Sequence, residues 1–289
     1  MKIIEPKVEL LSELNISPES HIARCARVCY GKEYKEPNQE ADKKMVDGLI
    51  KRGHLSMLRH SSIYVYNRLK DFAQYINASA YWSNYRYYGY ASTNLQEFNN
   101  VKHIFENHKD DGLIEIFSNK LFLENCSKVS ELFKLYRMTF CITTQISTSR
   151  ELNRVSPNAI VERSTRFCSS EDGLEICRPW WMFSSEENIV NGHCLPNEFL
   201  YYDITSRTEN YYEALLGQGM KPEDARGILP LDTATKVVYT YSVQEWKHIL
   251  DLRLYDKTGK AHPNCHVVMQ MVKDRINEFA KEYNIDFQV

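Results

Sequence analysis

The chain has 289 residues, of which 43% are hydrophobic and 26% charged, and its formal net charge is -2 at pH 7. This is close to ordinary globular composition, and the near-zero charge argues against a general nucleic-acid binder, which would be basic. We find no apolar run near the ~18 residues that a membrane span needs. With no Pro, Ser or Gly-rich linker and no internal repeat, we predict a single domain over residues 1–289.

The first elements in chain order are predicted to be two helices. Ser17 and Pro18 form a helix-start signal, because serine caps the free amide groups and proline fits the first turn. The inner face of this helix would carry Ile22, Cys25, Ala26 and Cys29. A second helix would turn Met45, Val46, Leu49 and Ile50 inward and stop at Gly53.

Residues 61–66 and 136–146 alternate in the manner of strands, the second through Met138, Phe140 and Ile142. Residues 100–134 are charged and helical in character and predict a surface excursion. We expect the remaining elements to be helices over 206–217, 222–226, 243–254 and 264–283 and a strand over 236–241. Because helices and strands do not alternate regularly, the order favours an α+β fold, a mixed sheet flanked by helices.

The eight cysteines include no Cys-x-x-Cys pair, and the opening MKIIEPKVELL lacks the apolar core of a signal peptide. His193-Cys194 and Cys265-His266 are two isolated dipeptides, which is weak support for a metal site. We therefore expect reduced structural thiols in a cytoplasmic protein that binds no metal.

Residues 150–168 hold the strongest functional signal. Guanidinium groups and hydroxyls gather there directly after a predicted strand, at Arg150, Arg154, Ser156, Arg163, Ser164, Thr165 and Arg166. Forked cationic donors and hydroxyls at this density suit an anion with several oxygen acceptors, most simply a phosphate monoester. The alternative is a network of ion pairs, for which Glu151 and Glu162 are available partners.

The same segment resembles the signature of the flavin-dependent thymidylate synthase (ThyX) family, Arg-His-Arg, seven residues, then Ser. Here the frame is Arg154-Val155-Ser156, seven residues, then Ser164. Three further segments resemble the family in its own order, between about residues 53 and 270. They are GHLSMLRH from Gly53, ARGILP from Ala225, and the run from Trp246 to Arg253 with the Ala261-His262-Pro263 turn.

The resemblance implies a ThyX-like fold and a homotetramer with active sites at subunit junctions. It implies reductive methylation of dUMP to dTMP, with FAD as cofactor and methylenetetrahydrofolate and NADPH as co-substrates. The dUMP contacts carried over are Glu151, Arg154, Glu162, Arg163, Ser164, Thr165, Arg166, Lys236 and His266. The FAD contacts carried over are Ser56, Arg154, Val155, Ser156, Asp251, Arg253 and His262. The catalytic residues would be His266 and Arg154, and Cys265 would have no nucleophilic role.

This sequence also departs from the family pattern. Val155 and Ser156 stand where the family has a His and an Arg, and Arg59 replaces an acidic residue. His266 stands where an Arg commonly polarises the uracil carbonyl, and an imidazole with a pKa near ~6.5 is only partly cationic at pH 7. Nucleotide binding would therefore survive these changes better than catalysis. Two alternatives stay open, another one-carbon modification such as hydroxymethylation and a non-catalytic nucleotide-binding relative.

Overall fold

The computed structural model describes residues 1–31, 36–80, 82–85, 89–108, 112–155, 159–164 and 173–289. Its main sheet has four strands in the order β2 (Lys7–Leu10), β7 (Arg137–Gln145), β10 (Ala234–Ser242) and β8 (Ile160–Glu162). All three strand pairs are antiparallel. The strands predicted over 136–146 and 236–241 are thereby confirmed, and they form the central pair of the sheet.

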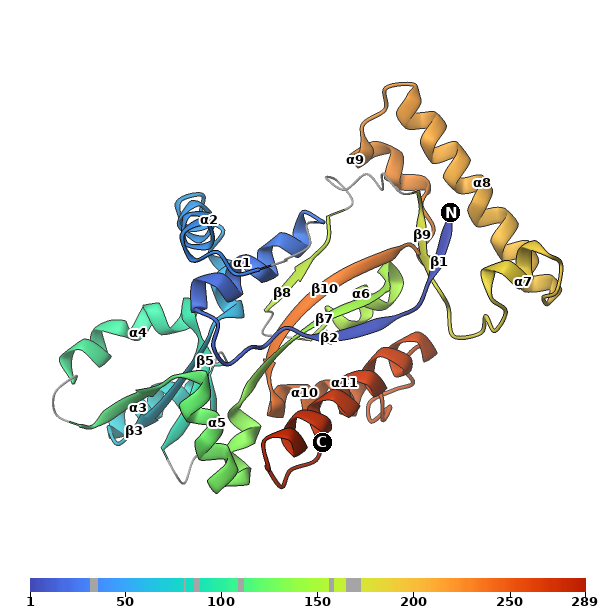
Figure 1. Ribbon diagram of the computed structural model, residues 1–289. Helices are drawn as coiled ribbons and strands as arrows, with labels where there is room; N and C mark the ends of the chain where they lie inside the picture. The colour runs from blue at the N-terminus through green and yellow to red at the C-terminus, as the bar shows by residue number, and fades with distance from the viewer. Residues whose placement is uncertain (32–35, 81, 86–88, 109–111, 156–158, 165–172) are drawn as a thin grey trace.

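Both faces of this sheet are covered, so every residue of β7 is buried. One face, with Phe140 and Ile142, packs in the main core with α10 (Val243–Arg253) and α11 (Pro263–Glu282). The other face, with Cys141 and Val238, packs against Cys25 of α1 (Pro18–Cys29). Figure 1 shows α1 and α11 on opposite sides of the sheet. This separation decides which predicted site residues can meet within one chain.

The two N-terminal helices follow the predicted signals. The Ser17 side chain accepts a hydrogen bond from the Ser20 amide at the start of α1, and Ile22, Cys25 and Ala26 are buried. In α2 (Gln39–Lys51), Val46 and Leu49 are buried, but Ile50 is 44% exposed, so its predicted inward position is wrong. Gly53 follows α2 at φ +76°, a conformation that glycine adopts without strain.

A second antiparallel sheet has the order β4 (Ser83–Tyr85), β5 (Tyr90–Asn94), β3 (Ser62–Asn67) and β6 (Ile114–Phe117). The elements around it are η1 (Leu55–His60), α3 (Lys70–Ala78), α4 (Leu95–Asn107), α5 (Asn119–Lys128) and η2 (Ser130–Leu135). The predicted surface excursion over 100–134 is wrong for α5 and η2. Phe122, Leu123 and Phe133 are buried in the main core, because these helices are amphipathic and their charged residues mark only the outer face.

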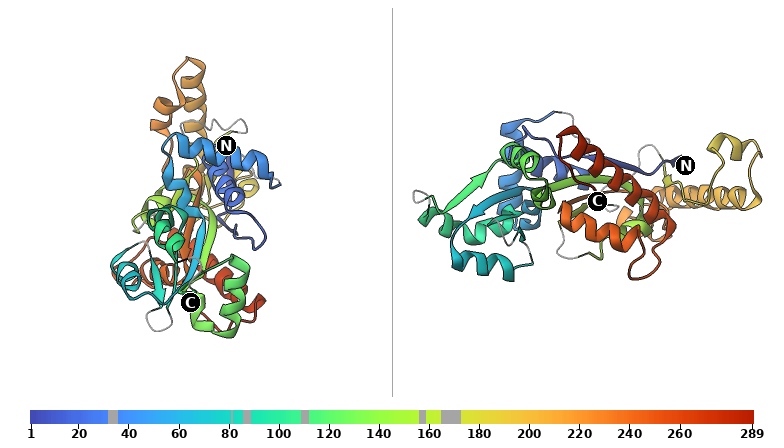
Figure 2. Two further views of the ribbon diagram at one scale, coloured as in Figure 1. Left: turned by 90° about the vertical axis from the view of Figure 1, so that its left-hand side faces the viewer. Right: turned by 90° about the horizontal axis from the view of Figure 1, so that it is seen from below.

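The rest of the chain forms a projecting arm and the segment that leads to it (Figure 2). A parallel pair joins β1 (Lys2–Ile4) to β9 (Glu175–Cys177), so parallel and antiparallel pairing both occur. The arm contains α7 (Glu186–Val190), α8 (Pro196–Gly217), α9 (Pro222–Ala225) and η3 (Arg226–Ile228). Helix α6 (Ile146–Leu152) is not part of the arm and follows β7 directly. The α+β class is confirmed. Among the described helices, none has the length and apolarity to cross a membrane.

Candidate active site

A cationic cleft of about 510 Å³ lies where α6 meets the end of α10. It is lined by Arg150, Glu151, Arg154, Arg253, Thr258, Gly259 and Lys260. Four of these side chains are cations and only Glu151 is an anion. Arg154 follows α6 by two residues and is exposed, whereas Arg253 ends α10 and its side chain is 17% exposed. The cleft therefore offers an unbalanced positive charge to an anionic ligand.

Glu151 of α6 lies beside Arg253 of α10 and Cys265 of α11. Its carboxylate lies 3.8 Å from the Arg253 guanidinium and is close enough to the Cys265 thiol to affect the pKa of that thiol. Burial raises the pKa of that thiol, and the neighbouring carboxylate raises it further. A fully buried, protonated thiol is a poor nucleophile.

The Arg253 guanidinium is not fully satisfied by the protein. Its Nε atom is buried and has no hydrogen-bond partner among the described residues. A buried donor without a partner costs free energy, on the order of 1–3 kcal/mol, unless a ligand or water accepts its hydrogen bond. This orphaned donor supports a ligand with oxygen acceptors beside Arg253.

His266 lies on the loop side of this region, where its imidazole Nε2 is 3.0 Å from Oδ1 of Asp256. The Ala261 amide donates to the same oxygen, and this bond, followed by the contact with His266, lowers the pKa of the Asp256 carboxyl. Asp256 and Ala261 belong to the loop that carries Gly259 and Lys260 into the cleft. His266 itself does not line the cleft, but it braces the loop that does.

Two further residues predicted to contact FAD also have local partners on this side. His262 caps α11, and its ring Nδ1 accepts a hydrogen bond from the Asn264 amide at 3.2 Å. Asp251 is paired with Lys257 at 2.8 Å. Val155 is 9% exposed and packs in the main core, because its apolar side chain turns away from water. Of the predicted FAD contacts that the structure describes, only Arg154 and Arg253 line the cleft.

Glu162 is held beside α6 by hydrogen bonds from two hydroxyl groups and one side-chain amide, and these bonds were not predicted from the sequence. Its carboxylate accepts hydrogen bonds from Ser149 at 2.7 Å, Thr235 at 3.1 Å and the Asn153 amide at 3.3 Å. Ser149 and Asn153 lie four positions apart, a helical spacing that places both on one side of α6. This four-residue spacing was the feature of the sequence that could have predicted the network. The network holds Glu162 near the residues that precede Arg154.

Among the remaining predicted nucleotide contacts, those that the structure describes lie on the other face of the sheet. Thr235 faces Glu162, so the next residue of β10, Lys236, projects to the opposite face with Cys141. The Arg163 side chain reaches Glu175 at 3.5 Å, and the Ser164 amide donates to Cys29 of α1. Ser56 is exposed on η1, which packs against α1 and α2. Ser156, Thr165 and Arg166 lie outside the described residues.

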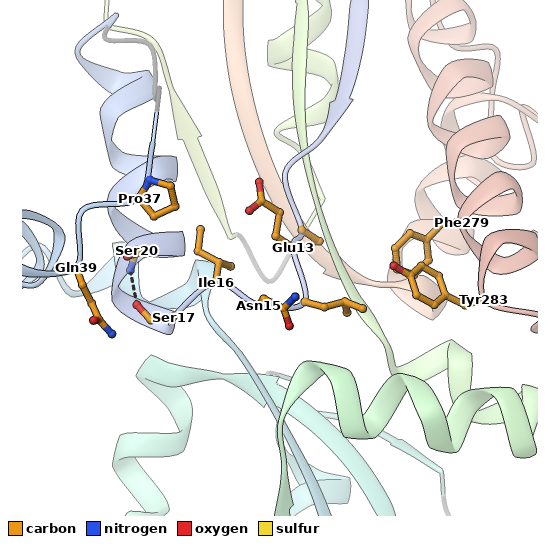
Figure 3. A pocket seen from close by; sticks show the side chains of 11 residues that line it. Glu13, Asn15, Ile16, Ser17, Ser20, Pro37, Gln39, Phe279 and Tyr283 are labelled. Atoms are coloured by element: carbon orange, nitrogen blue, oxygen red, sulfur yellow. Dashed lines mark hydrogen bonds between the residues drawn. The ribbon is translucent and has the colours of Figure 1, made fainter.

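A larger cavity of about 670 Å³ lies elsewhere, between the loop over residues 12–17 and the end of α11 (Figure 3). Glu13 is the only charged residue among the described residues that line it, and Glu13 is paired with Arg24. It contains none of the predicted site residues. The cationic cleft is therefore the better candidate for an anionic ligand. The described residues also contain no group of three or more His, Cys, Asp or Glu side chains placed to hold a metal ion.

Comparison with known proteins agrees with the resemblance in the sequence. Residues 81–280 match the family model described as thymidylate synthase complementing protein. A flavin-dependent thymidylate synthase from Halobacterium salinarum is 39% identical over 56 residues, which are 19% of this chain and 23% of that protein. One from Synechocystis is 36% identical over 59 residues, 20% of this chain and 27% of that protein. The chain thus spans about a quarter of the length of these curated relatives.

Two solved structures of a UMP/dUMP methylase, PolB from Streptomyces cacaoi, also resemble this chain. The structure with 5-Br dUMP aligns over 97% of this chain and 93% of its own, at 15% identity and a TM-score of 0.42. The structure with 5-Br UMP aligns over 99% and 94%, at 14% identity and a TM-score of 0.44. The family model alone covers well over half of the sequence. The chain belongs to the thymidylate synthase complementing protein (ThyX) family.

Proposed function

We propose that this chain is a flavin-dependent thymidylate synthase that converts dUMP to dTMP as a cytoplasmic homotetramer. Methylenetetrahydrofolate would supply the carbon, with FAD as cofactor and NADPH as reductant. The observation that carries the proposal is the cationic cleft, in which Arg154 and Arg253 stand with one carboxylate and one buried donor lacks a partner. This is the donor set that a pyrophosphate or phosphate requires.

The described residues fit FAD at this cleft. Arg150, Arg154, Arg253 and Lys260 would hold its negatively charged groups, and the unpartnered Arg253 Nε would gain an acceptor. When bound and reduced, FAD supplies a hydride. Glu151 would keep Arg253 oriented, because the two side chains already lie 3.8 Å apart. Asp256 and His266 would fix the loop that places Lys260 at the cleft.

The nucleotide would be held by residues from both faces of the sheet. Ser164, Thr165 and Arg166 would bind the dUMP phosphate, with Arg163 and Lys236 as further cations and Arg154 between nucleotide and flavin. Lys236 and Glu162 project from opposite faces of one sheet, and a site shared between copies of the chain would bring residues of both faces together. This arrangement supports the proposed homotetramer with active sites at subunit junctions.

In this scheme the protein orients the uracil ring and controls its protons. His266 would polarise a uracil carbonyl and favour loss of the N3 proton, the role that an arginine commonly has in the family. Preorganised electrostatic donors are typically worth on the order of 100-fold to 1000-fold in rate. Glu162 is held by three donors, so its carboxylate is preoriented for a hydrogen bond from the nucleotide.

Flavin content tests this proposal against its non-catalytic alternative. The purified chain would be incubated with FAD, desalted, and its absorbance at flavin wavelengths compared with its protein concentration. A stoichiometric yellow complex that dUMP then perturbs supports the synthase. A colourless protein that still binds dUMP would support a nucleotide-binding relative without flavin chemistry.

A further inference from the structure

Tyr239 in β10 is buried, yet its hydroxyl reaches a residue beside the cleft. Its oxygen lies 2.8 Å from Oδ1 of Asn153, the residue that caps the end of α6 and directly precedes Arg154. The amide nitrogen of Asn153 in turn lies 3.3 Å from Oε2 of Glu162. Helix α6 packs against β7 and β10 (Figure 1), so three distant parts of the chain contribute to one line of hydrogen bonds.

The donors and acceptors in this line can be arranged in only one way. Burial raises the pKa of the Tyr239 hydroxyl well above its usual range, and the charge of Glu162 raises it further, so the hydroxyl keeps its proton. A carboxylate only accepts hydrogen bonds, so the amide of Asn153 must turn its nitrogen to Glu162 and its oxygen to Tyr239. The tyrosine hydroxyl therefore determines which end of the amide faces the carboxylate.

The two oxygens of Glu162 are used unequally. Oε1 accepts hydrogen bonds from Ser149 at 2.7 Å and from Thr235 at 3.1 Å. Among the described residues, Oε2 accepts only the bond from Asn153, and a carboxylate oxygen has room for two. Oε2 therefore keeps one lone pair for a further donor, and the direction of this lone pair depends on Asn153.

We propose that Asn153 and Tyr239 are positioning residues, which act on the nucleotide through Glu162 without touching it. The Tyr239 hydroxyl fixes the Asn153 amide, and the amide turns Oε2 of Glu162 toward a hydrogen-bond donor of the nucleotide. This role rests on the proposed function, in which Glu162 contacts dUMP. If the same bonds served only to close the end of α6, their loss would lower stability and leave the affinity for the nucleotide unchanged.

Tyr239→Phe tests this role because it removes the hydroxyl and keeps the ring. We expect the Kd for dUMP, measured by calorimetry, to rise about threefold to tenfold, the usual effect of losing one neutral hydrogen bond. The Kd for FAD should stay within about twofold. Tyr241→Phe is the matched control, because Tyr241 is also buried, stacks on Tyr239 and has a hydroxyl without a partner among the described residues. This control should bind dUMP as the wild type does.

Asn153→Asp adds a readout that depends on pH. A protonated acid at this position can donate to Glu162 as the amide does, whereas an ionised acid repels the Glu162 carboxylate. The ratio of the variant's Kd for dUMP to that of the wild type should therefore stay near one at pH 5.5 and rise to about tenfold at pH 8. Taking the ratio at each pH cancels the titration of the dUMP phosphate.

The outcomes separate this role from the proposed function. Equal dUMP affinity in Tyr239→Phe and Tyr241→Phe, or a ratio for Asn153→Asp that does not vary with pH, would overturn the positioning role and leave the proposed function intact. A wild type that binds no dUMP would contradict the proposed function, and the positioning role with it. Because the assay measures binding, it decides the role of the two residues whether or not the chain turns dUMP over.

Discussion

The Arg253 guanidinium, at the end of α10, lies 3.8 Å from the Glu151 carboxylate in α6. This pair joins two elements that are about a hundred positions apart in the sequence and meet beside the main sheet. Glu151 also lies beside the Cys265 thiol, and the buried Nε of Arg253 has no hydrogen-bond partner among the described residues. Glu151, the one carboxylate among the described residues that line the cleft, therefore orients Arg253, and the four cations leave the cleft with a net positive charge.

Replacing Arg253 should weaken FAD binding. Arg253→Ala removes a buried cationic donor from the cleft, and a hydrogen bond to a charged group is worth ~1.5–3 kcal/mol, or roughly 10-fold to 100-fold in Kd. Titration of flavin fluorescence measures this change. Arg275→Ala is the matched control, because Arg275 pairs with Glu278 and Glu282 on the surface of α11. Equal affinity in both variants would remove Arg253 from the FAD site.

Replacing Arg166 should weaken dUMP binding more than FAD binding. Arg166 belongs to the family-like segment after β8, and the proposal assigns it to the nucleotide phosphate. Arg166→Ala should raise the Kd for dUMP by on the order of 10-fold to 100-fold, measured by calorimetry, and leave the Kd for FAD within about twofold. An equal loss of both affinities would indicate a folding defect instead.

An arginine at position 266 should raise turnover at alkaline pH. A guanidinium stays charged at every pH used in an assay, so under the proposed function His266→Arg would place a permanent cation beside the uracil ring. We expect kcat at pH 8 to rise by about tenfold or more, and the same comparison at pH 6 shows whether the gain depends on pH. Unchanged turnover at both pH values would remove His266 from the catalytic residues.

Mild acid should destabilise the fold through two buried histidines. His21 bonds to Thr139 at 3.0 Å, Thr139 to Thr240 at 2.8 Å, and Thr240 to His60 at 2.9 Å. Burial lowers the pKa of His21 to about 4 and that of His60 to about 3, from 6.5. Their contribution is therefore complete above pH 6.5 and falls below it, because only the unfolded chain takes up protons there.

Urea unfolding at pH 7 and pH 5 measures this loss, which should be on the order of 2 kcal/mol per histidine. His21→Gln keeps a polar atom near the ring Nε2 and removes one titrating group, so the dependence of stability on pH should fall by about half. His193→Gln, at an exposed position, should leave the dependence unchanged. A wild type equally stable at both pH values would contradict the buried, neutral state of the pair.

Local signals predicted the elements with the clearest caps, glycine stops and alternation, because these patterns depend on residues close in sequence, but they missed strands such as β2, β5 and β8. The Ser17 cap of α1, the stop at Gly53 and the strands β7 and β10 were all visible as caps, glycine and alternation. The burial of Phe122 could not be predicted from the sequence. The residue pattern of a charged amphipathic helix is the same whether its apolar stripe packs against a core or against another surface helix.

The candidate site was predictable in composition but not in arrangement. The cluster of arginines and hydroxyls after residue 149 predicted an anion site, and two of the predicted arginines, Arg154 and Arg253, line one cleft. The sequence could not show that Lys236 and Glu162 lie on opposite faces of the sheet, because that depends on the register between β8 and β10. For the same reason, the sequence could not show that Ser149 and Thr235 both donate hydrogen bonds to Glu162.

The most direct test of the account is tritium release from dUMP labelled at C5. The full chain would be assayed with FAD, NADPH and methylenetetrahydrofolate together, and with each one omitted in turn. We predict release that requires all three, which would show that Val155, Ser156 and His266 are tolerated replacements in a working synthase. Bound dUMP without any release would contradict the proposed reaction and would leave this chain as a nucleotide-binding member of its family.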